Sequence, residues 1–193
     1  ILITMTGLSM MLAGCGGGQK APDKQTEADT VPADFKYEVD AFADLEILRY
    51  YVPGFNNLTL EQKELVYYLS MAAIEGRDIL FDQNNRYNLA IRRTLEAIYG
   101  NFKGDKNSAD YKEFEVYLKR VWFSNGIHHH YGEEKFLPGF SKEFFAEQVK
   151  NLPAELVPVK EGQSVDDFIK MLTPVMFDAR VMAKKVNLSL IHI

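Results

Sequence analysis

The stretch SADYKEFEVYLKRVWF, residues 108–123, decides the fold, because its apolar residues recur at helical spacing along its whole length. The expected buried face consists of Tyr111, Phe114, Leu118, Val121 and Trp122. Asn107 or Ser108 is the expected N-cap, since a short polar side chain can accept a hydrogen bond from the first free N–H groups of a helix. The pattern predicts a helix that packs by one face against other helices.

The following segment, WFSNGIHHHYGEEKFLPGF at 122–140, has neither a helical nor a strand period and crowds amide, imidazole and phenol groups together. Ser124-Asn125-Gly126 is expected to end the helix, with Asn125-Gly126 as its C-cap. Pro138-Gly139 closes the loop before another helix begins at Ser141. Loops held between rigid elements often carry binding groups, so this one is the first candidate for function.

Two helices are predicted before residue 108. The first follows the capping box Thr59-x-x-Gln62. Its apolar face consists of Leu65, Leu69, Ala72 and Gly76. The second runs from about Asn85 to Tyr99 and ends at Gly100. Its apolar stripe consists of Ile91, Leu95, Ile98 and Tyr99.

Two more helices are predicted after the loop, at Ser141 and at the capping box Ser164-x-x-Asp167. Their apolar positions are Phe144, Phe145, Val149 and Leu152 in the first, and Phe168 and Leu172 in the second. Near the start, Phe35, Tyr37 and Val39 alternate with polar residues, and 45–52 is β-prone. The expected fold class is mainly α, with one or two short strands or extended arms near the start.

The ends of the chain are interpreted separately from the fold at 34–187. Residues 1–14 are apolar and lead to Leu12-Ala13-Gly14-Cys15, the pattern of a bacterial lipoprotein signal. Cys15 would then carry a lipid anchor; the alternative is a buried leader helix with an inert cysteine. Residues 15–33 have the composition of a flexible tether. We interpret 188–193 as the translation of a sequencing-adapter fragment.

Composition excludes several classes of protein. The net charge of -5 and interleaved acids and bases do not fit a nucleic-acid surface, so no nucleic-acid partner is expected. A hydrophobic content of 47% excludes a disordered chain. One cysteine excludes an internal disulfide and a Cys-rich zinc or iron–sulfur site.

His128-His129-His130 leave three interpretations open: a metal site, a role in substrate or hydrogen bonding, and loop packing. At most His128 and His130 could share an ion, because neighbouring residues of an extended chain point in opposing directions. That ion would lack ligands unless Glu133 or Glu134 folded back. The Glu133-Glu134 pair fits a solvated acidic turn better than paired catalytic carboxylates. Ser124 is rejected as a hydrolase nucleophile, since adjacency in sequence supplies neither a positioned base nor an oxyanion hole.

Three long strings carry a resemblance to a known family: LTLEQKELVYYLSMAAIEGRDILFDQN at 58–84, YLKRVWFSNGIHHHYGEEKFLPGFS at 117–141, and DDFIKMLTPVMFD at 166–178. From about Ala33 to Asn187 the chain resembles the N-terminal part of a Bacteroides-type dipeptidyl peptidase III. Members of that family are two-lobed zinc metallopeptidases that release dipeptides from the N-terminus of short peptides. The resemblance implies the helical N-terminal part of such an enzyme.

The family's zinc motif, His-Glu-x-x-x-His, and its Glu-Glu-x-x-Ala-type partner do not occur in this sequence. The resemblance therefore implies a substrate-side fragment that binds no metal and is inactive alone, with zinc in the full-length enzyme. It also implies Asn125, Gly126, His130 and Tyr131 as substrate contacts, with no catalytic residue among them. With Cys15 as anchor, the expected location is the bacterial cell envelope, periplasmic or surface-facing. The alternative is a non-catalytic surface lipoprotein with a helical peptide- or protein-binding domain.

Overall fold

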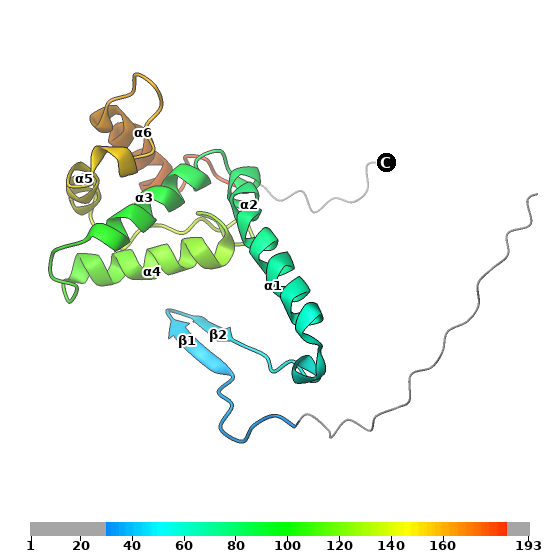
Figure 1. Cartoon of the computed structure of the whole chain (residues 1–193). Coiled ribbons are helices and arrows are strands. Elements are labelled where there is room, and N and C mark those ends of the chain that lie inside the picture. The colour runs from blue at the N-terminus through cyan, green and yellow to red at the C-terminus, as the bar shows by residue number, and fades with distance from the viewer. Residues whose placement is uncertain (1–29, 185–193) are drawn as a thin grey trace, which may run out of the picture.

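The computed structural model describes residues 30–184, which fold as a mainly helical structure with a short antiparallel hairpin (Figure 1). The strands are β1 (Glu38–Phe42) and β2 (Leu45–Leu48). The helices are α1 (Leu60–Glu75), α2 (Arg77–Asn84), α3 (Asn88–Asn101), α4 (Ala109–Ser124), α5 (Lys142–Lys150) and α6 (Val165–Phe177), with 3-10 turns η1 (Phe55–Asn57) and η2 (Ala154–Leu156). The interpretations of residues 1–29, including Cys15, and of 188–193 lie outside the described residues.

All five predicted helices are present, and four of them have the N-terminal caps that were expected. Thr59 Oγ1 accepts from the Gln62 N–H at 3.2 Å and Gln62 Oε1 accepts from the Thr59 N–H at 2.9 Å, which completes the capping box of α1. Ser108, rather than Asn107, caps α4. Ser141 and Ser164 cap α5 and α6. Short-range polar patterns thus located these four helix starts correctly.

The boundary before α3 was predicted wrongly. Asn85 is extended and ends a helix that was not predicted, α2, while its carbonyl and side chain accept from the Asn88 and Tyr87 N–H groups. This turn uses the residues that the prediction had placed in the first turn of α3. Gly100 does not end α3 either, because the helix continues to Asn101.

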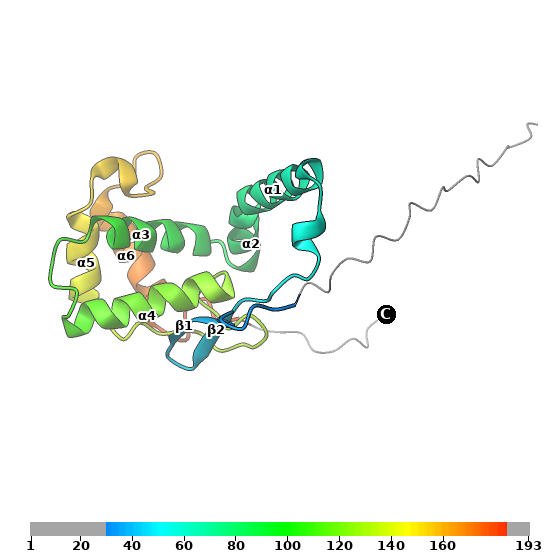
Figure 2. The same ribbon diagram turned by 60° about the horizontal axis from the view of Figure 1, so that its bottom comes forward.

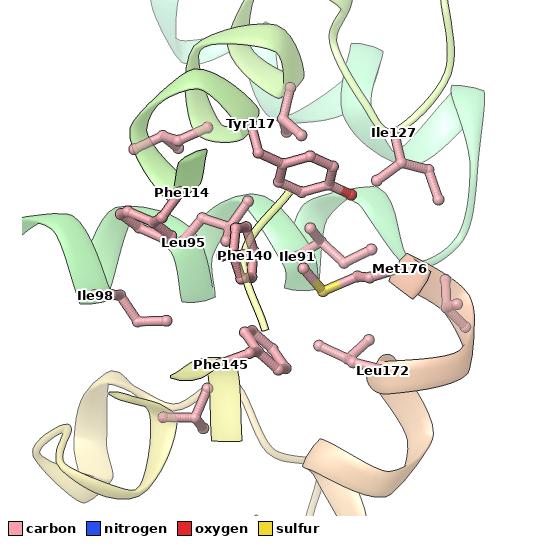
Figure 3. Packing of buried hydrophobic residues seen from close by; sticks show 14 of the residues in the cluster. Ile91, Leu95, Ile98, Phe114, Tyr117, Ile127, Phe140, Phe145, Leu172 and Met176 are labelled. Atoms are coloured by element: carbon pink, nitrogen blue, oxygen red, sulfur yellow. The ribbon is translucent and has the colours of Figure 1, made fainter. Parts of the chain in front are cut away.

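The hydrophobic core lies between α3, α4, α5 and α6 and includes side chains from the loop after α4. Figure 3 shows these side chains converging, with Ile127 and Phe140 of the loop beside the helical residues. The predicted positions Ile91, Leu95, Ile98, Tyr111, Phe114, Leu118, Val121, Phe145, Val149, Phe168 and Leu172 are buried. The loop is therefore part of the packed structure, because its own apolar residues pack in the core.

Helix α1 is the main departure from the predicted packing. None of its residues is buried, and Leu65 and Leu69, on its expected inner face, are 58% and 60% exposed. Figures 1 and 2 both show α1 extending away from α3–α6. Spacing reveals which face of a helix is apolar, but it does not tell whether another element covers that face. Trp122, also expected inside, is 37% exposed, because its indole N–H reaches outward to Glu96.

Ion pairs connect the hairpin and α2 to the bundle, and the buried Phe81 of α2 also packs in the core. Lys119 Nζ of α4 lies 2.9 Å from Asp40 of β1, and Arg120 pairs with Asp44 in the hairpin turn. In α2, Asp78 pairs with Arg93 and with the buried Arg92 of α3, and these guanidinium groups lower the pKa of the Asp78 carboxyl. Figure 2 shows the hairpin beside α4.

Within residues 30–184, no helix has both the length and the apolar content needed to cross a bilayer.

Candidate functional site

Two asparagines hold the first residues of the loop after α4. Asn125 ends α4 in the left-handed region, with φ 53°, as the predicted C-cap. Its carbonyl accepts from Asn84 Nδ2 at 3.3 Å and from Asn88 Nδ2 at 3.4 Å. Two residues further on, the backbone N–H of Ile127 donates to Asn88 Oδ1 at 3.2 Å. Asn88 is buried, so these bonds fix the loop backbone against α2 and α3.

Gly126 is required by this arrangement. Its φ is 151°, and a Cβ at this position would lie 2.1 Å from Asn88 Nδ2. Only a glycine lets the backbone approach the asparagine amide so closely.

The loop from Ile127 to Phe136 is a narrow hairpin. His128 and Lys135 form an antiparallel bridge, flanked by hydrogen bonds from the His129 N–H to Glu134 O and from the Phe136 N–H to Ile127 O. At its tip, His129 Nδ1 accepts from the N–H groups of Tyr131 and Gly132. The polar sequence that gave no period in the prediction is ordered by these local bonds.

Three long side chains bind this hairpin to the segment after α6. His128 Nε2 donates to Met182 O at 2.9 Å, and since a carbonyl only accepts, Nε2 carries the proton. Lys135 Nζ donates to the carbonyls of Asp178 and Val181 at 2.8 and 2.6 Å. Lys184 Nζ donates to His129 O at 3.0 Å. Of the three interpretations for the histidines, hydrogen bonding within the fold is the one that His128 fulfils.

The buried position of His128 predicts a pH dependence of stability. Desolvation lowers its pKa below the ordinary value of about 6.5, which the unfolded chain retains. As the pH falls through about 6.5, the unfolded chain binds a proton that the native imidazole does not, so the free energy of unfolding decreases. Urea unfolding at about pH 7.5 and about pH 5.5 measures this decrease. We expect the free energy of unfolding to fall less in His128→Gln than in the parent chain, because glutamine keeps an N–H donor but does not titrate.

The matched control is His130→Gln, which removes an exposed imidazole that makes no hydrogen bond among the described residues. It should retain the loss of stability seen in the parent chain. An equal loss in the parent and in His128→Gln would assign the acid sensitivity to other groups.

A small cavity of about 80 Å³ lies where these parts meet. It is lined by Asn84, Asn88, Ser124–Gly126, His128, His130 and Lys184. The structure thus brings together three of the four predicted contacts, Asn125, Gly126 and His130. Tyr131 does not line the cavity; it is 84% exposed, and its ring centroid lies 4.3 Å from that of His130.

Sequence reasoning missed Asn84, Asn88 and Lys184 as members of the site. A signal for the asparagines was present in the sequence DQNNRYN at 82–88, where amide side chains gather at a helix break. No local signal identified Lys184, because it reaches the cavity only through the turn after α6. Ser124, rejected as a nucleophile, lies in the cavity wall.

The described residues do not fit a zinc ion. Among residues 30–184, no group of three or more His, Cys, Asp or Glu side chains is placed to hold a metal. The Nε2 of His128 is committed to Met182 O, while the ring of His130 is exposed and stacks with that of His129 at 4.6 Å. What the site offers instead is a set of amide, hydroxyl and ammonium donors.

Comparison of the chain with protein-family models and with curated protein sequences gives no match. The chemistry of the site and the three strings quoted above are therefore what support a function.

Proposed function

We propose that this chain is the substrate-side, helical N-terminal part of a two-lobed zinc dipeptidyl peptidase that releases dipeptides from short peptides. In this proposal Cys15 carries the lipid anchor that holds the enzyme in the bacterial cell envelope. The observation that carries the proposal is the loop at 125–136. The string with the most specific resemblance, at 117–141, covers the end of α4 and the hairpin at 127–136, which lies beside a polar cavity.

The loop is suited to binding a peptide backbone. The side-chain amide of Asn125 makes no hydrogen bond to the described residues and lies at the cavity, and the phenol of Tyr131 is exposed at the tip. An amide can both donate to and accept from a peptide group, and a phenol can do the same with one oxygen. Asn84 and Asn88 hold the backbone of Asn125, and the Tyr131 N–H donates to His129 Nδ1. These two groups would then orient a peptide without a large rearrangement of the loop.

These residues take no part in breaking the peptide bond. Zinc, when bound by the other lobe of such an enzyme, supplies the Lewis acid, but residues 30–184 offer no fitting set of ligands. Their contribution in the complete enzyme is to bind and orient the substrate.

The exposed apolar residues of α1 also support a place in a larger structure. Leu60, Leu65, Tyr67, Tyr68, Leu69 and Ile74 are all more than half exposed on this one helix. These side chains lie on several sides of the helix, and so much exposed apolar surface usually marks a contact with another part of a protein or with a partner. The string 58–84, which carries part of the resemblance, includes the whole of α1.

The complete enzyme provides the test. Asn125→Gly removes the amide and keeps a residue suited to the left-handed backbone, while Tyr131→Phe removes only the hydroxyl. Losing one hydrogen bond should cost about 0.5–1.5 kcal/mol, so each change should lower kcat/KM roughly two- to twelvefold. Zinc content should stay the same, since neither residue belongs to the metal site.

Tyr50→Phe, which removes a hydroxyl from a tyrosine that is 76% exposed and does not line the cavity, is the matched control and should leave kcat/KM unchanged. If both loop variants keep the parent kcat/KM, Asn125 only caps its helix and Tyr131 only covers His130, and this loop is removed from the substrate site.

A second candidate function is a non-catalytic surface lipoprotein whose helical domain binds a peptide or protein. The exposed apolar residues of α1 favour it, because the same surface would serve an external partner. The two candidates differ in whether a zinc lobe is encoded in the same gene.

A further inference from the structure

The lining of the cavity at the end of α4 has an unbalanced charge. Lys184 is its one permanently charged group, and no Asp or Glu lines it. Among the described residues, Lys184 has no ion pair, and its only recorded hydrogen bond is to His129 O. An ammonium group has three donors and no acceptor, so this lysine retains donors for a negatively charged ligand.

The asparagines add further donors. Each Nδ2 carries two hydrogens, and the bonds to Asn125 O use one from Asn84 and one from Asn88. The Oδ1 of Asn88 is already occupied by the Ile127 N–H. Asn84 and Asn88 therefore each keep an N–H donor beside the ammonium group of Lys184, and these donors suit a ligand made of oxygen acceptors.

Ser124 supplies an independent indication that this cavity binds a polar ligand. It lines the cavity, it is 3% exposed, and its Oγ has no hydrogen-bond partner among the described residues. Buried hydroxyl groups are nearly always bonded, because leaving one unpaired forfeits its hydration without replacement.

The size of the cavity limits what can enter. Its volume of about 80 Å³ corresponds to two or three water molecules at about 30 Å³ each. A carboxylate group, with two oxygens on one carbon, matches this space, whereas a whole peptide does not. The remainder of such a ligand would lie outside, where His130 and Tyr131 are exposed.

We propose that the cavity formed by Ser124, Asn84, Asn88 and Lys184 binds the C-terminal carboxylate of a short peptide. This inference rests on the proposed function for the peptide, but the carboxylate chemistry follows from the cavity alone. A subsite of this kind selects peptides short enough to place their C-terminus there, and it excludes peptides whose C-terminus is blocked.

The test uses NMR titration of the isotope-labelled chain, read at the side-chain amide signals of Asn84 and Asn88. The probes are tetra-alanine with a free C-terminus, tetra-alanine amide, and acetate. We expect the free acid to shift both signals and the amide to bind at least about tenfold more weakly, because a charge-assisted bond is lost. Acetate should shift the same signals at higher concentration.

Variants identify the cation. Lys184→Gln should abolish the preference for the free acid and Lys184→Arg should retain it. Lys112→Gln, the same change at an exposed lysine on α4, should have no effect. Ser124→Ala leaves the charge in place and should weaken the binding of the free-acid peptide only. It tests the site independently if Lys184→Gln disturbs the turn after α6.

The outcomes separate this inference from the proposed function. Equal affinity for the acid and the amide would overturn the carboxylate site while leaving peptide binding intact. Shifts with acetate but with neither peptide would support the carboxylate site and count against the peptide. Unchanged Asn84 and Asn88 signals with all probes would overturn the inference.

Discussion

Replacing Leu118 by alanine is expected to lower the free energy of unfolding by about 2–5 kcal/mol, whereas the same change at Leu69 should alter it by no more than about 0.5 kcal/mol. Leu118 lies on the buried face of α4 and is completely covered by the core, so its truncation removes contacts and leaves a cavity. Leu69 lies on α1 and is 60% exposed, so little packing is lost there.

Urea unfolding of the two variants, followed by circular dichroism, measures both values. Leu69→Ala should also reduce the fluorescence of a dye that binds exposed apolar surface, and Leu118→Ala should not reduce it. A loss at Leu69 as large as that at Leu118 would mean that α1 packs against the bundle in solution.

Gly126→Ala is expected to destabilise the chain by about 2–4 kcal/mol, because the added Cβ displaces Asn88 and strains a backbone that alanine rarely adopts. The Cβ would lie 2.1 Å from Asn88 Nδ2, and the φ of 151° is unfavourable for any residue with a side chain. Moving Asn88 breaks its bonds to Asn125 and Ile127, so the cavity should be lost along with stability.

Gly100→Ala is the matched control. Gly100 is helical and exposed, and a Cβ there meets nothing within 4 Å. Alanine is the better helix former, so this change should raise the free energy of unfolding by about 0.5–1 kcal/mol. If thermal unfolding shows both glycine variants to be equally stable, the close approach of Gly126 and Asn88 does not exist in solution.

The sequence predicted well those features that depend on near neighbours. The caps at Thr59, Ser108, Ser141 and Ser164 were correct because the donor and acceptor of a cap lie within three residues. The C-cap at Asn125 was correct for the same reason. Which faces are covered depends on distant chain, and this explains the errors at α1 and Trp122.

The site was predicted in part for a related reason. Asn125, Gly126 and His130 were identified because they gather in one unpatterned stretch. Asn84 and Asn88 come from elements before α4, and Lys184 reaches the cavity from the turn after α6. Contacts across such separations depend on how α2, α3 and α6 pack, which helical spacing does not specify.

The most direct test of the proposed function is to read the gene, in frame, across and beyond codon 187. We expect a His-Glu-x-x-x-His motif to follow in the same frame within several hundred nucleotides to about two kilobases, as the resemblance implies. A native stop codon directly after residue 193, in reads that carry those last codons, would contradict it and leave the chain as a helical binding protein.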